Sequence, residues 1–536
     1  MIAQPRPLAP SGSAPQALRH YLVVAAILLS GLLLKAALMD TESTSFDSDE
    51  AIVALMARHI LAGERPLFFY GQAYMGSLDA FLTAASFWLF GSSVWALRAV
   101  QGLLFVGLML GTYCLARRLY KDECTAQTSA LLIAIPPSLF SLYTTVTLGG
   151  YGETLLCGIW LLILGQQITH EAQTSWLHWA VFGLVAGLSL WILPLSVVYL
   201  LPLLLLIVRK WRWQLGGRYG AAVVTFLLGS SPWWGYCLGH GEACLQPFLK
   251  PAASQVVSAG WLPALGYRVF SFLFLGIPTL WGLRYPWSSD VFLSLVAAPA
   301  IVLYLGSVVH ALYNRDEGRI LVLAVMGTFL LVFLGTSFGN DSTGRYLLPL
   351  YPCFALLGAR SIGQLRQHKR WLAAAALVSV LAFSLGRTVA GAATEPAGMT
   401  AQLDGRLQFG NGYDAALISF LRERDERVGY SNYWVAFKID FLANEEIVIA
   451  PRLPYKADLS YSSTDDRYPA YSRKVDQSAT PPFYITSNQP RLDERLRGAL
   501  DVQHIGYQEQ VIGPYLVFYD LSVHVSPEGL ELYGQP

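Results

Sequence analysis

The stretch Phe46-Asp47-Ser48-Asp49-Glu50 follows the first long apolar run of the chain, Tyr21–Met39. That run is long enough to cross a bilayer, which takes about 20 apolar residues. Carboxylates at a membrane face are costly to desolvate, so an acidic cluster there indicates chemistry or ion binding. An aromatic and glycine-rich loop, Gly63–Ser77, follows soon after. We therefore expect an active site to begin here, at the surface of a membrane.

The composition of the chain is typical of a polytopic α-helical membrane protein. Of its 536 residues, 54% are hydrophobic and 14% are charged, whereas soluble domains carry about 25% charged residues. The net charge of +1 gives no sign of a nucleic-acid partner. Residues 1–18 are rich in proline, and we expect them to form a disordered cytoplasmic tail.

Eleven apolar runs are long enough to be membrane spans. They lie at residues 19–39, 92–116, 124–144, 152–168, 176–192, 194–209, 218–238, 290–312, 319–338, 345–361 and 371–391. The positive-inside rule decides whether two further apolar runs, 74–90 and 263–283, cross the membrane. Counting the first as a span would put Arg117-Arg118 outside, and counting the second alone would put the basic cluster 360–370 outside. We therefore expect both runs to form interfacial or re-entrant helices.

The composition changes sharply after residue 391, where the membrane part (19–391) ends. With a cytoplasmic N-terminus and these spans, residues 392–536 lie on the same outer face as the acidic stretch. We predict a helix at Tyr413–Asp425 and β-like segments at Arg427–Tyr430, Glu446–Ala450, Pro482–Thr486 and Tyr515–Leu521. This alternation is typical of a small α/β domain with a partly parallel sheet. No catalytic constellation appears in it, so we expect an extracytoplasmic accessory domain, in which residues 430–434 either contact an acceptor or pack in the core.

Several short motifs follow the first apolar run in a fixed order. They are Asp49-Glu50-Ala51, Ala57–Glu64, Gly71–Tyr74, Leu89-Phe90-Gly91, Leu97-Arg98 and Arg345–Pro352. In order and spacing they resemble the GT-C glycosyltransferases, in the branch of the lipid A aminoarabinose transferases and protein O-mannosyltransferases. The resemblance covers the membrane part. It implies a GT-C-like fold in a bacterial inner membrane and transfer of a sugar from a polyprenyl-phosphate donor at the outer face, with inversion.

The resemblance also implies roles for individual residues. The family's catalytic Asp falls on Asp49, and its second-loop acid falls near Glu153. The aminoarabinose transferases carry Lys-Pro after the first interfacial helix, where the lysine meets the donor phosphate, but this chain has Met75-Gly76 there. If the donor is still a lipid phosphate, another cation must hold it. Arg345 is the first candidate and Arg58 the second.

The acidic residues have structural as well as catalytic interpretations. Transfer to a hydroxyl needs a base to take the acceptor proton, and we assign Asp49 that role. The alternative is that residues 47–49 only cap a helix. Asp47 and Asp49, with Glu153, also have the spacing to bind a divalent cation, although we expect no required cofactor. Glu153 has two interpretations. It orients the acceptor or Asp49, or it is an ordinary acid in the first turn of the next helix.

The predicted substrate-contacting residues lie in the same loops. An Arg at position 345 can grip a phosphate bidentately, or it can anchor the end of a span. Glu50 is expected mainly to hydrogen-bond within its loop. The full predicted set is Glu50, Arg58, Tyr70, Gln72, Tyr74, Tyr151, Arg345 and Tyr346. The expected partners are a polyprenyl-phosphate-sugar donor, a lipid, glycan or protein acceptor, and membrane lipids.

Two other functions compete with sugar transfer. A transporter or flippase of lipid-linked glycans would show inverted repeats and charges within its spans, and these spans are nearly free of charge and unrepeated. A non-catalytic membrane scaffold would use its outer domain to recruit partners. The cysteines have no spacing of a zinc site. Cys237 and Cys244 either form a disulfide across a short loop or stay reduced.

Overall fold

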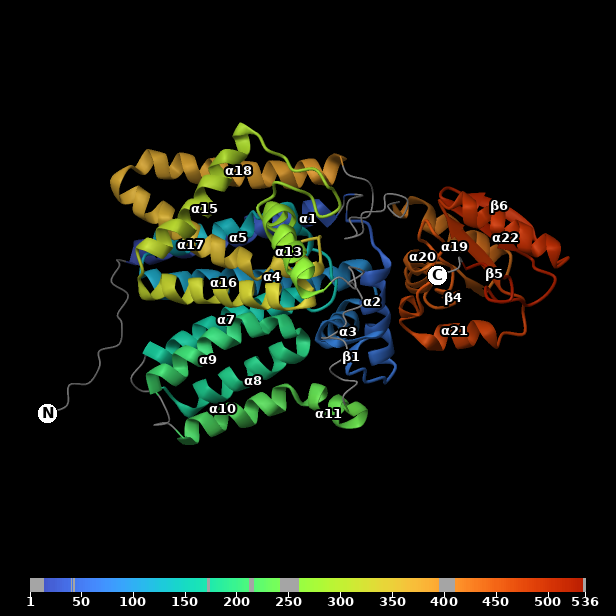
Figure 1. Ribbon diagram of the computed structural model, residues 1–536, viewed down its shortest axis with the longest axis horizontal. Coiled ribbons are helices and arrows are strands. Elements are labelled where there is room, and N and C mark those ends of the chain that lie inside the picture. The colour runs from blue at the N-terminus through green and yellow to red at the C-terminus, as the bar shows by residue number, and fades with distance from the viewer. Residues whose placement is uncertain are drawn as a thin grey trace.

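A computed structural model describes residues 14–39, 41, 44–170, 174–211, 216–241, 260–394 and 410–533 of the chain. It shows a long body of helices joined at one end to a smaller domain that contains a sheet (Figure 1). The helical body corresponds to the membrane part, and the smaller domain, described from Gly410, is called the C-terminal domain below. This is the fold class that the sequence predicted.

The body is built from helices that follow the apolar runs. They are α1 (Ala14–Met39), α2 (Ser48–Leu61), α3 (Leu78–Phe90), α4 (Val94–Tyr120), α5 (Glu123–Ala134), α6 (Ser138–Leu142), α7 (Tyr151–His170), α8 (Trp176–Ile192), α9 (Val197–Trp211), α10 (Gly216–Gly229), α11 (Ser231–His240), α13 (Trp261–Phe270), α14 (Ile277–Leu280), α15 (Ala298–Tyr313), α16 (Glu317–Gly335), α17 (Leu350–His368) and α18 (Arg370–Thr394). Helix α1 begins within the predicted tail, of which residues 1–13 lie outside the described residues.

Seven helices among the described residues are long and apolar enough to cross a membrane. They are Leu18–Met39, Val94–Tyr120, Pro194–Trp211, Trp261–Leu280, Leu295–Tyr313, Glu317–Gly335 and Arg370–Ala393. Trp261–Leu280 overlaps the run that charge counting assigned to the interface, so length and hydropathy do not support that assignment. The predicted span 124–144 is instead broken, because α5 ends at Ala134 before Pro136-Pro137.

A short amphipathic layer lies between the body and the C-terminal domain. It consists of α2, α3 and a hairpin of two antiparallel strands, β1 (Phe68–Phe69) and β2 (Gln72–Gly76). Helix α2 is well capped, since Asp47 is its N-cap and Asp49 and Glu50 lie in its first turn. Helix α3 takes up the later part of the run 74–90, whose first residues lie in β2, and with 13 residues it is shorter than the roughly 20 that a span needs.

The C-terminal domain has a five-stranded sheet in the order β4-β3-β5-β7-β6. Its strands are β3 (Val428–Tyr430), β4 (Val448–Ala450), β5 (Phe483–Ser487), β6 (Gln508–Ile512) and β7 (Tyr515–Tyr519). Its helices are α19 (Asp414–Glu423), α20 (Tyr433–Leu442), α21 (Pro469–Asp476) and α22 (Pro490–Val502). β3 pairs parallel with β4 and β5, and β7 pairs antiparallel with β5 and β6, so the sheet is partly parallel as predicted.

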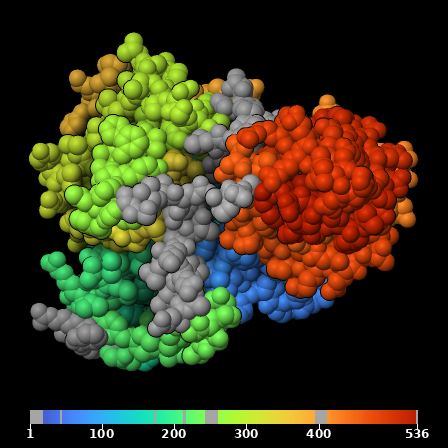
Figure 2. All heavy atoms as spheres, turned by 45° about the vertical axis from the view of Figure 1, so that its right-hand side comes forward, coloured from blue at the N-terminus to red at the C-terminus, as the bar shows by residue number. Residues whose placement is uncertain are grey.

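The C-terminal domain packs directly on the amphipathic layer. Figure 2 shows its orange and red surface against the blue α2–α3 region. Helices α2 and α20 are in extensive contact. The ring of Phe441 on α20 lies 5.3 Å from that of Phe46 and 6.1 Å from that of Phe87. This contact brings residues far apart in the sequence to the acidic stretch.

Candidate active site

Asp49 lies where the two parts of the molecule meet. It occupies the first turn of α2, and its side chain is half-buried. The hydroxyl of Tyr433, at the start of α20, donates a hydrogen bond to Asp49 Oδ1. Burial and the Asp49 carboxylate raise the pKa of Tyr433, so that the phenol keeps the proton it donates. The predicted base is therefore oriented by the C-terminal domain.

The other two carboxylates of the acidic stretch hold the local structure. Asp47 accepts a hydrogen bond from the backbone N–H of Glu50 at 3.1 Å, as a capping residue does. Burial raises the pKa of Asp47, and the neighbouring carboxylates raise it further. Glu50 is fully buried, and its oxygens accept from Arg98 at 2.5 and 3.1 Å and from the N–H of Thr147 at 3.2 Å. Glu50 thus binds Arg98 rather than facing a substrate, contrary to its place in the predicted substrate-contacting set.

A second pair of acids is buried nearby. Asp79 lies in the first turn of α3 and Glu153 in the first turn of α7, and their carboxyl groups lie against each other. Thr147 and Gln101 donate hydrogen bonds to Asp79, whereas Glu153 has no other partner among the described residues. Burial raises the pKa of Asp79 to about 6. The structure therefore brings the predicted Glu153 to Asp79, a residue that the sequence analysis did not single out.

Arg345, the first candidate for holding the donor phosphate, lies among tyrosines. It begins the short 3-10 helix η7 (Arg345–Leu347), and its Nη2 is 2.9 Å from Asp341 Oδ2. Its guanidinium lies 5.1 Å from the centre of the Tyr346 ring, and that ring lies 6.4 Å from the ring of Tyr151. The Nε of Arg345 is buried without a hydrogen-bond partner among the described residues. Arg345 thus keeps a donor for a further ligand.

Tyr74, on β2, connects this arginine with Asp49. Its hydroxyl hydrogen-bonds to Tyr346, and the charges of Arg345 and Asp49 both act on it. Burial raises the pKa of Tyr74, and the positive charge of Arg345 opposes that rise. Four predicted residues (Asp49, Tyr74, Arg345 and Tyr346) therefore lie near one another, with the charges of an acid and an arginine both acting on one phenol.

Arg58 belongs to the domain interface and not to this cluster. Its Nε donates to Ser92 Oγ at 2.7 Å, and its terminal nitrogens donate to Phe441 O at 2.9 Å and to Asn444 Oδ1 at 2.8 Å. The guanidinium also lies 4.0 Å from the centre of the Phe441 ring. With these partners in place Arg58 clamps α2 to the C-terminal domain. These contacts occupy the guanidinium, and the role of Arg58 as a phosphate ligand stays a prediction.

Tyr70 also serves the domain interface. Its hydroxyl donates to Glu64 Oε2 at 2.6 Å, and Tyr468 of the C-terminal domain donates to Glu64 Oε1 at 2.7 Å. The rings of Tyr70 and Tyr468 stack at 4.6 Å. Beside them, His59 Nε2 lies 2.9 Å from Glu445 Oε1. The predicted substrate contact of Tyr70 is therefore replaced by a contact between domains.

Arg467 of the C-terminal domain is a site residue that the sequence analysis missed. It lies between the 3-10 helix η10 (Ser463–Asp465) and α21. With the amide oxygen of Gln72 turned toward it, Gln72 accepts hydrogen bonds from its two terminal nitrogens at 2.7 and 2.9 Å. The charge of Arg467 acts on both Asp49 and Tyr74. Gln72, predicted to contact substrate, thus holds an arginine at the edge of the cluster. No motif in the sequence marks Arg467.

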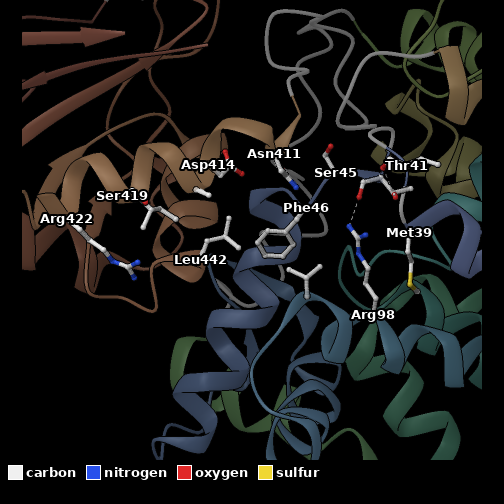
Figure 3. Close-up of a pocket in the computed structure, with 14 residues that line it drawn as sticks. Met39, Thr41, Ser45, Phe46, Arg98, Asn411, Asp414, Ser419, Arg422 and Leu442 are labelled. Carbon is white, nitrogen blue, oxygen red and sulfur yellow. Dashed lines mark hydrogen bonds between the residues drawn. The ribbon is translucent and has the colours of Figure 1, made fainter. Parts of the chain in front are cut away.

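A cavity of about 620 Å³ lies beside the acidic stretch, at the same domain boundary. Figure 3 shows it between the segment from Met39 to Phe46 and helix α19, with Arg98 at one side and Arg422 at the other. Arg98 donates to the backbone oxygen of Thr44 at 2.6 Å at its edge. Neither Asp49 nor Arg345 lines it. The cavity therefore adjoins the cluster without containing the predicted base.

The described residues bear on two further predictions, a divalent cation site and a disulfide. In that part of the chain, no group of three or more His, Cys, Asp or Glu side chains is arranged to hold a metal ion. Asp47 and Asp49 also face different partners, a backbone N–H and Tyr433. Cys237 is disulfide-bonded. Cys244 lies outside the described residues, so its pairing with Cys237 stays a prediction.

Comparison with known proteins connects this arrangement to a family. Residues 76–236 match the family described as Dolichyl-phosphate-mannose-protein mannosyltransferase. ArnT from Cupriavidus metallidurans, in its apo state, shares the fold at a TM-score of 0.61 and 14% identity, over 98% of this chain and 100% of that one. The chain has the fold of the GT-C glycosyltransferases. The fold implied by the resemblance is confirmed, and the family match covers residues 76–236 of the membrane part.

Other solved structures agree with this GT-C assignment. ArnT from Cupriavidus metallidurans bound to undecaprenyl phosphate matches at a TM-score of 0.61 and 13% identity, over 98% of this chain and 100% of that one. The archaeal oligosaccharyltransferase AglB from Archaeoglobus fulgidus, in complex with an inhibitory peptide and a dolichol-phosphate, matches at 0.52 and 14% identity, over 95% of this chain and 75% of that one. No curated protein sequence matches this GT-C chain.

Proposed function

We propose that the protein transfers a sugar from a polyprenyl-phosphate donor to an acceptor hydroxyl at the outer face of a bacterial inner membrane. Asp49 acts as the general base, and the sugar is inverted at the anomeric carbon. The observation that carries this proposal is the cluster of Asp49, Tyr74 and Arg345 at the end of the helical body. The acceptor, a lipid, glycan or protein, approaches from the side of the C-terminal domain.

The chemistry follows from the charges in the cluster. As the anomeric C–O bond breaks, its electron pair goes to the departing lipid phosphate, whose growing negative charge Arg345 stabilises. The acceptor oxygen forms the new bond to the anomeric carbon, and its proton passes to Asp49. The match of residues 76–236 to a mannosyltransferase family supports a phosphate-linked sugar donor. The undecaprenyl phosphate bound in ArnT supports a polyprenyl phosphate in particular.

The test is a comparison of Asp49→Asn with the wild type. Asparagine keeps the shape of the side chain and can accept the hydrogen bond from Tyr433, but it cannot take a proton. We expect loss of at least about 100-fold in transfer of radiolabelled sugar from lipid-linked donor pools, the usual contribution of a general base. Asp290→Asn, at an exposed position, is the matched control and should transfer normally. Wild-type glycolipids in cells that carry only Asp49→Asn would refute the proposal and favour a flippase or a scaffold.

A further inference from the structure

Among the described residues no carboxylate forms an ion pair with Arg467, although the more distant carboxylates of Asp49 and Asp465 act on its charge. Within the described residues, no acidic oxygen lies within 4.0 Å of its guanidinium, unlike Arg345, which pairs with Asp341 at 2.9 Å. The Nε of Arg467 is buried and has no hydrogen-bond partner there. Its other described hydrogen-bond partners are neutral, namely Gln72 and the backbone oxygen of Gly71 at 3.5 Å. A buried guanidinium N–H without a partner is costly, so this position favours an anionic ligand that accepts a hydrogen bond from it directly.

The backbone around Arg467 is shaped to keep it there. Gly71 has a φ of +70°, and a side chain at this position would meet Arg467 Cδ at 2.6 Å. The hairpin of β1 and β2 can therefore approach the arginine closely only because it turns at a glycine. On the other side, the guanidinium lies 5.6 Å from the centre of the Tyr433 ring. Arg467 is thus held between the hairpin and the phenol that orients Asp49.

The arginine points its charge at the proposed reaction centre. Both Arg467 and Arg345 act on the phenol of Tyr74, and Arg467 also acts on Asp49. Two guanidinium groups, one from each part of the molecule, therefore act on Tyr74. A phosphate within reach of both would accept hydrogen bonds from both. It would also be a direct ion-pair partner for Arg467, which has none among the described residues.

We propose that Arg467 binds the phosphate of the lipid-linked donor through two hydrogen bonds, so that the C-terminal domain supplies part of the donor site. This inference rests on the proposed function. It changes the predicted role of that domain from an accessory one to a substrate-binding one. As the anomeric C–O bond breaks and the phosphate takes the electron pair, Arg467 and Arg345 share the developing charge.

The test measures selectivity for phosphate over alcohol, using undecaprenyl phosphate and undecaprenol as probes on the full chain in nanodiscs. Loss of a charge-assisted, two-bond contact should weaken binding of undecaprenyl phosphate by about 10- to 100-fold in Arg467→Gln. Binding of undecaprenol should change by less than about twofold, because the alcohol carries no charge. Arg467→Lys keeps the charge but not the planar fork, so an intermediate selectivity is expected.

Two control variants separate phosphate binding from domain docking. Arg473→Gln changes an exposed arginine on α21 and should behave like the wild type. Arg58→Gln loosens the domain interface, and it should weaken both probes equally if it weakens either. Folding of each variant is checked by its elution profile and thermal transition.

The outcomes distinguish this inference from the proposed function. If the wild type prefers undecaprenyl phosphate and Arg467→Gln keeps that preference, the inference is overturned and the proposed function stands. If Arg467→Gln does not fold, the test rests on Arg467→Lys. Wild-type selectivity for undecaprenyl phosphate over undecaprenol in that variant overturns the two-bond contact. If the wild type has no preference for the phosphate, the inference and the proposed donor fall together, whatever the result for Asp49→Asn.

Discussion

The hydroxyl of Tyr433 donates a hydrogen bond to Asp49, a residue 384 positions away in the sequence. The phenol comes from the C-terminal domain and the carboxylate from the first turn of α2, so the two domains meet at the proposed base. Tyr433 acts through Asp49 and is a positioning residue. Its contribution can be measured separately from that of the base.

We expect Tyr433→Phe to lower kcat for sugar transfer about tenfold, the effect of one lost charge-assisted hydrogen bond. The KM for the lipid donor should stay unchanged, because the ring remains and no donor contact is removed. Tyr468→Phe is the matched control, since it removes an interdomain hydrogen bond to Glu64 without touching Asp49. An equal fall of kcat in both variants would mean that Tyr433 only docks the domains.

Arg58→Gln is expected to loosen the contact between α2 and α20. The change removes hydrogen bonds to Phe441 and Asn444 and a cation–π contact, on the order of 2 kcal/mol of docking free energy. Hydrogen exchange should increase at the end of α20, and the thermal transition should fall by several degrees. Arg65→Gln is the control, because within the described part of the chain Arg65 hydrogen-bonds only to the nearby backbone oxygens of Ile60 and Glu64. Similar exchange in the two variants would refute the clamp.

Asp79 makes stability depend on pH. Its pKa is raised to about 6, above the ordinary value for an aspartate, because burial penalises the charged form. The folded protein is therefore more stable when Asp79 is protonated. Its free energy of unfolding falls as the pH rises from about 4 to about 6. Asp79→Asn should remove this loss and raise the free energy of unfolding at pH 7 by on the order of 1–3 kcal/mol.

The measurement for Asp79 is the thermal transition in detergent between pH 4 and pH 8. Asp122→Asn is a contrasting variant, because burial raises the pKa of Asp122 but hydrogen bonds from Thr125 lower it overall. Its stabilisation is present at neutral pH and lost as the pH falls through that lowered pKa, so Asp122→Asn should destabilise the protein at pH 7. Parallel pH profiles for the wild type and Asp79→Asn would contradict the assignment.

Gly71→Ala should disturb Arg467 without changing any charge. A Cβ at this position meets Arg467 Cδ at 2.6 Å, on a backbone with φ of +70°. Gly63→Ala is the control, since Gly63 also has a positive φ of +112° but nothing lies within 4 Å of the added carbon. Both substitutions should cost about 1 kcal/mol or more in stability from backbone strain. Only Gly71→Ala should also lower selectivity for undecaprenyl phosphate, and equal selectivity would argue against the placement of Arg467.

Much of the fold could be predicted because it depends on local pattern. The acidic first turn of α2 and the strands β3, β4, β5 and β7 lie close to their predicted positions. The edge strand β6 was missed, since its residues Gln508-Glu509-Gln510 are polar and exposed and show no alternation. The positive-inside rule led us to expect an interfacial or re-entrant helix where the structure has the long helix Trp261–Leu280. The rule counts charges and takes no account of the length of a helix.

The candidate site was harder to predict, because it is assembled by packing between domains. Asp49, Tyr74, Arg345 and Tyr346 belong to motifs that mark them in the sequence, and the structure brings them near one another, while their roles stay predictions. Arg58 and Tyr70 are polar residues in the same loops, and only their partners in the C-terminal domain show that they dock it. Arg467 carries no motif, and its role depends on a contact with Gln72 that no local pattern encodes.

Because a phenol from the C-terminal domain hydrogen-bonds to Asp49, the orientation of the proposed base depends on how the two domains pack together. A shortened chain that ends with α18 would leave the ring of Phe46 uncovered and Arg58 and His59 without their partners on α20 and the turn after it. Such a fragment would span the bilayer yet lack an oriented base.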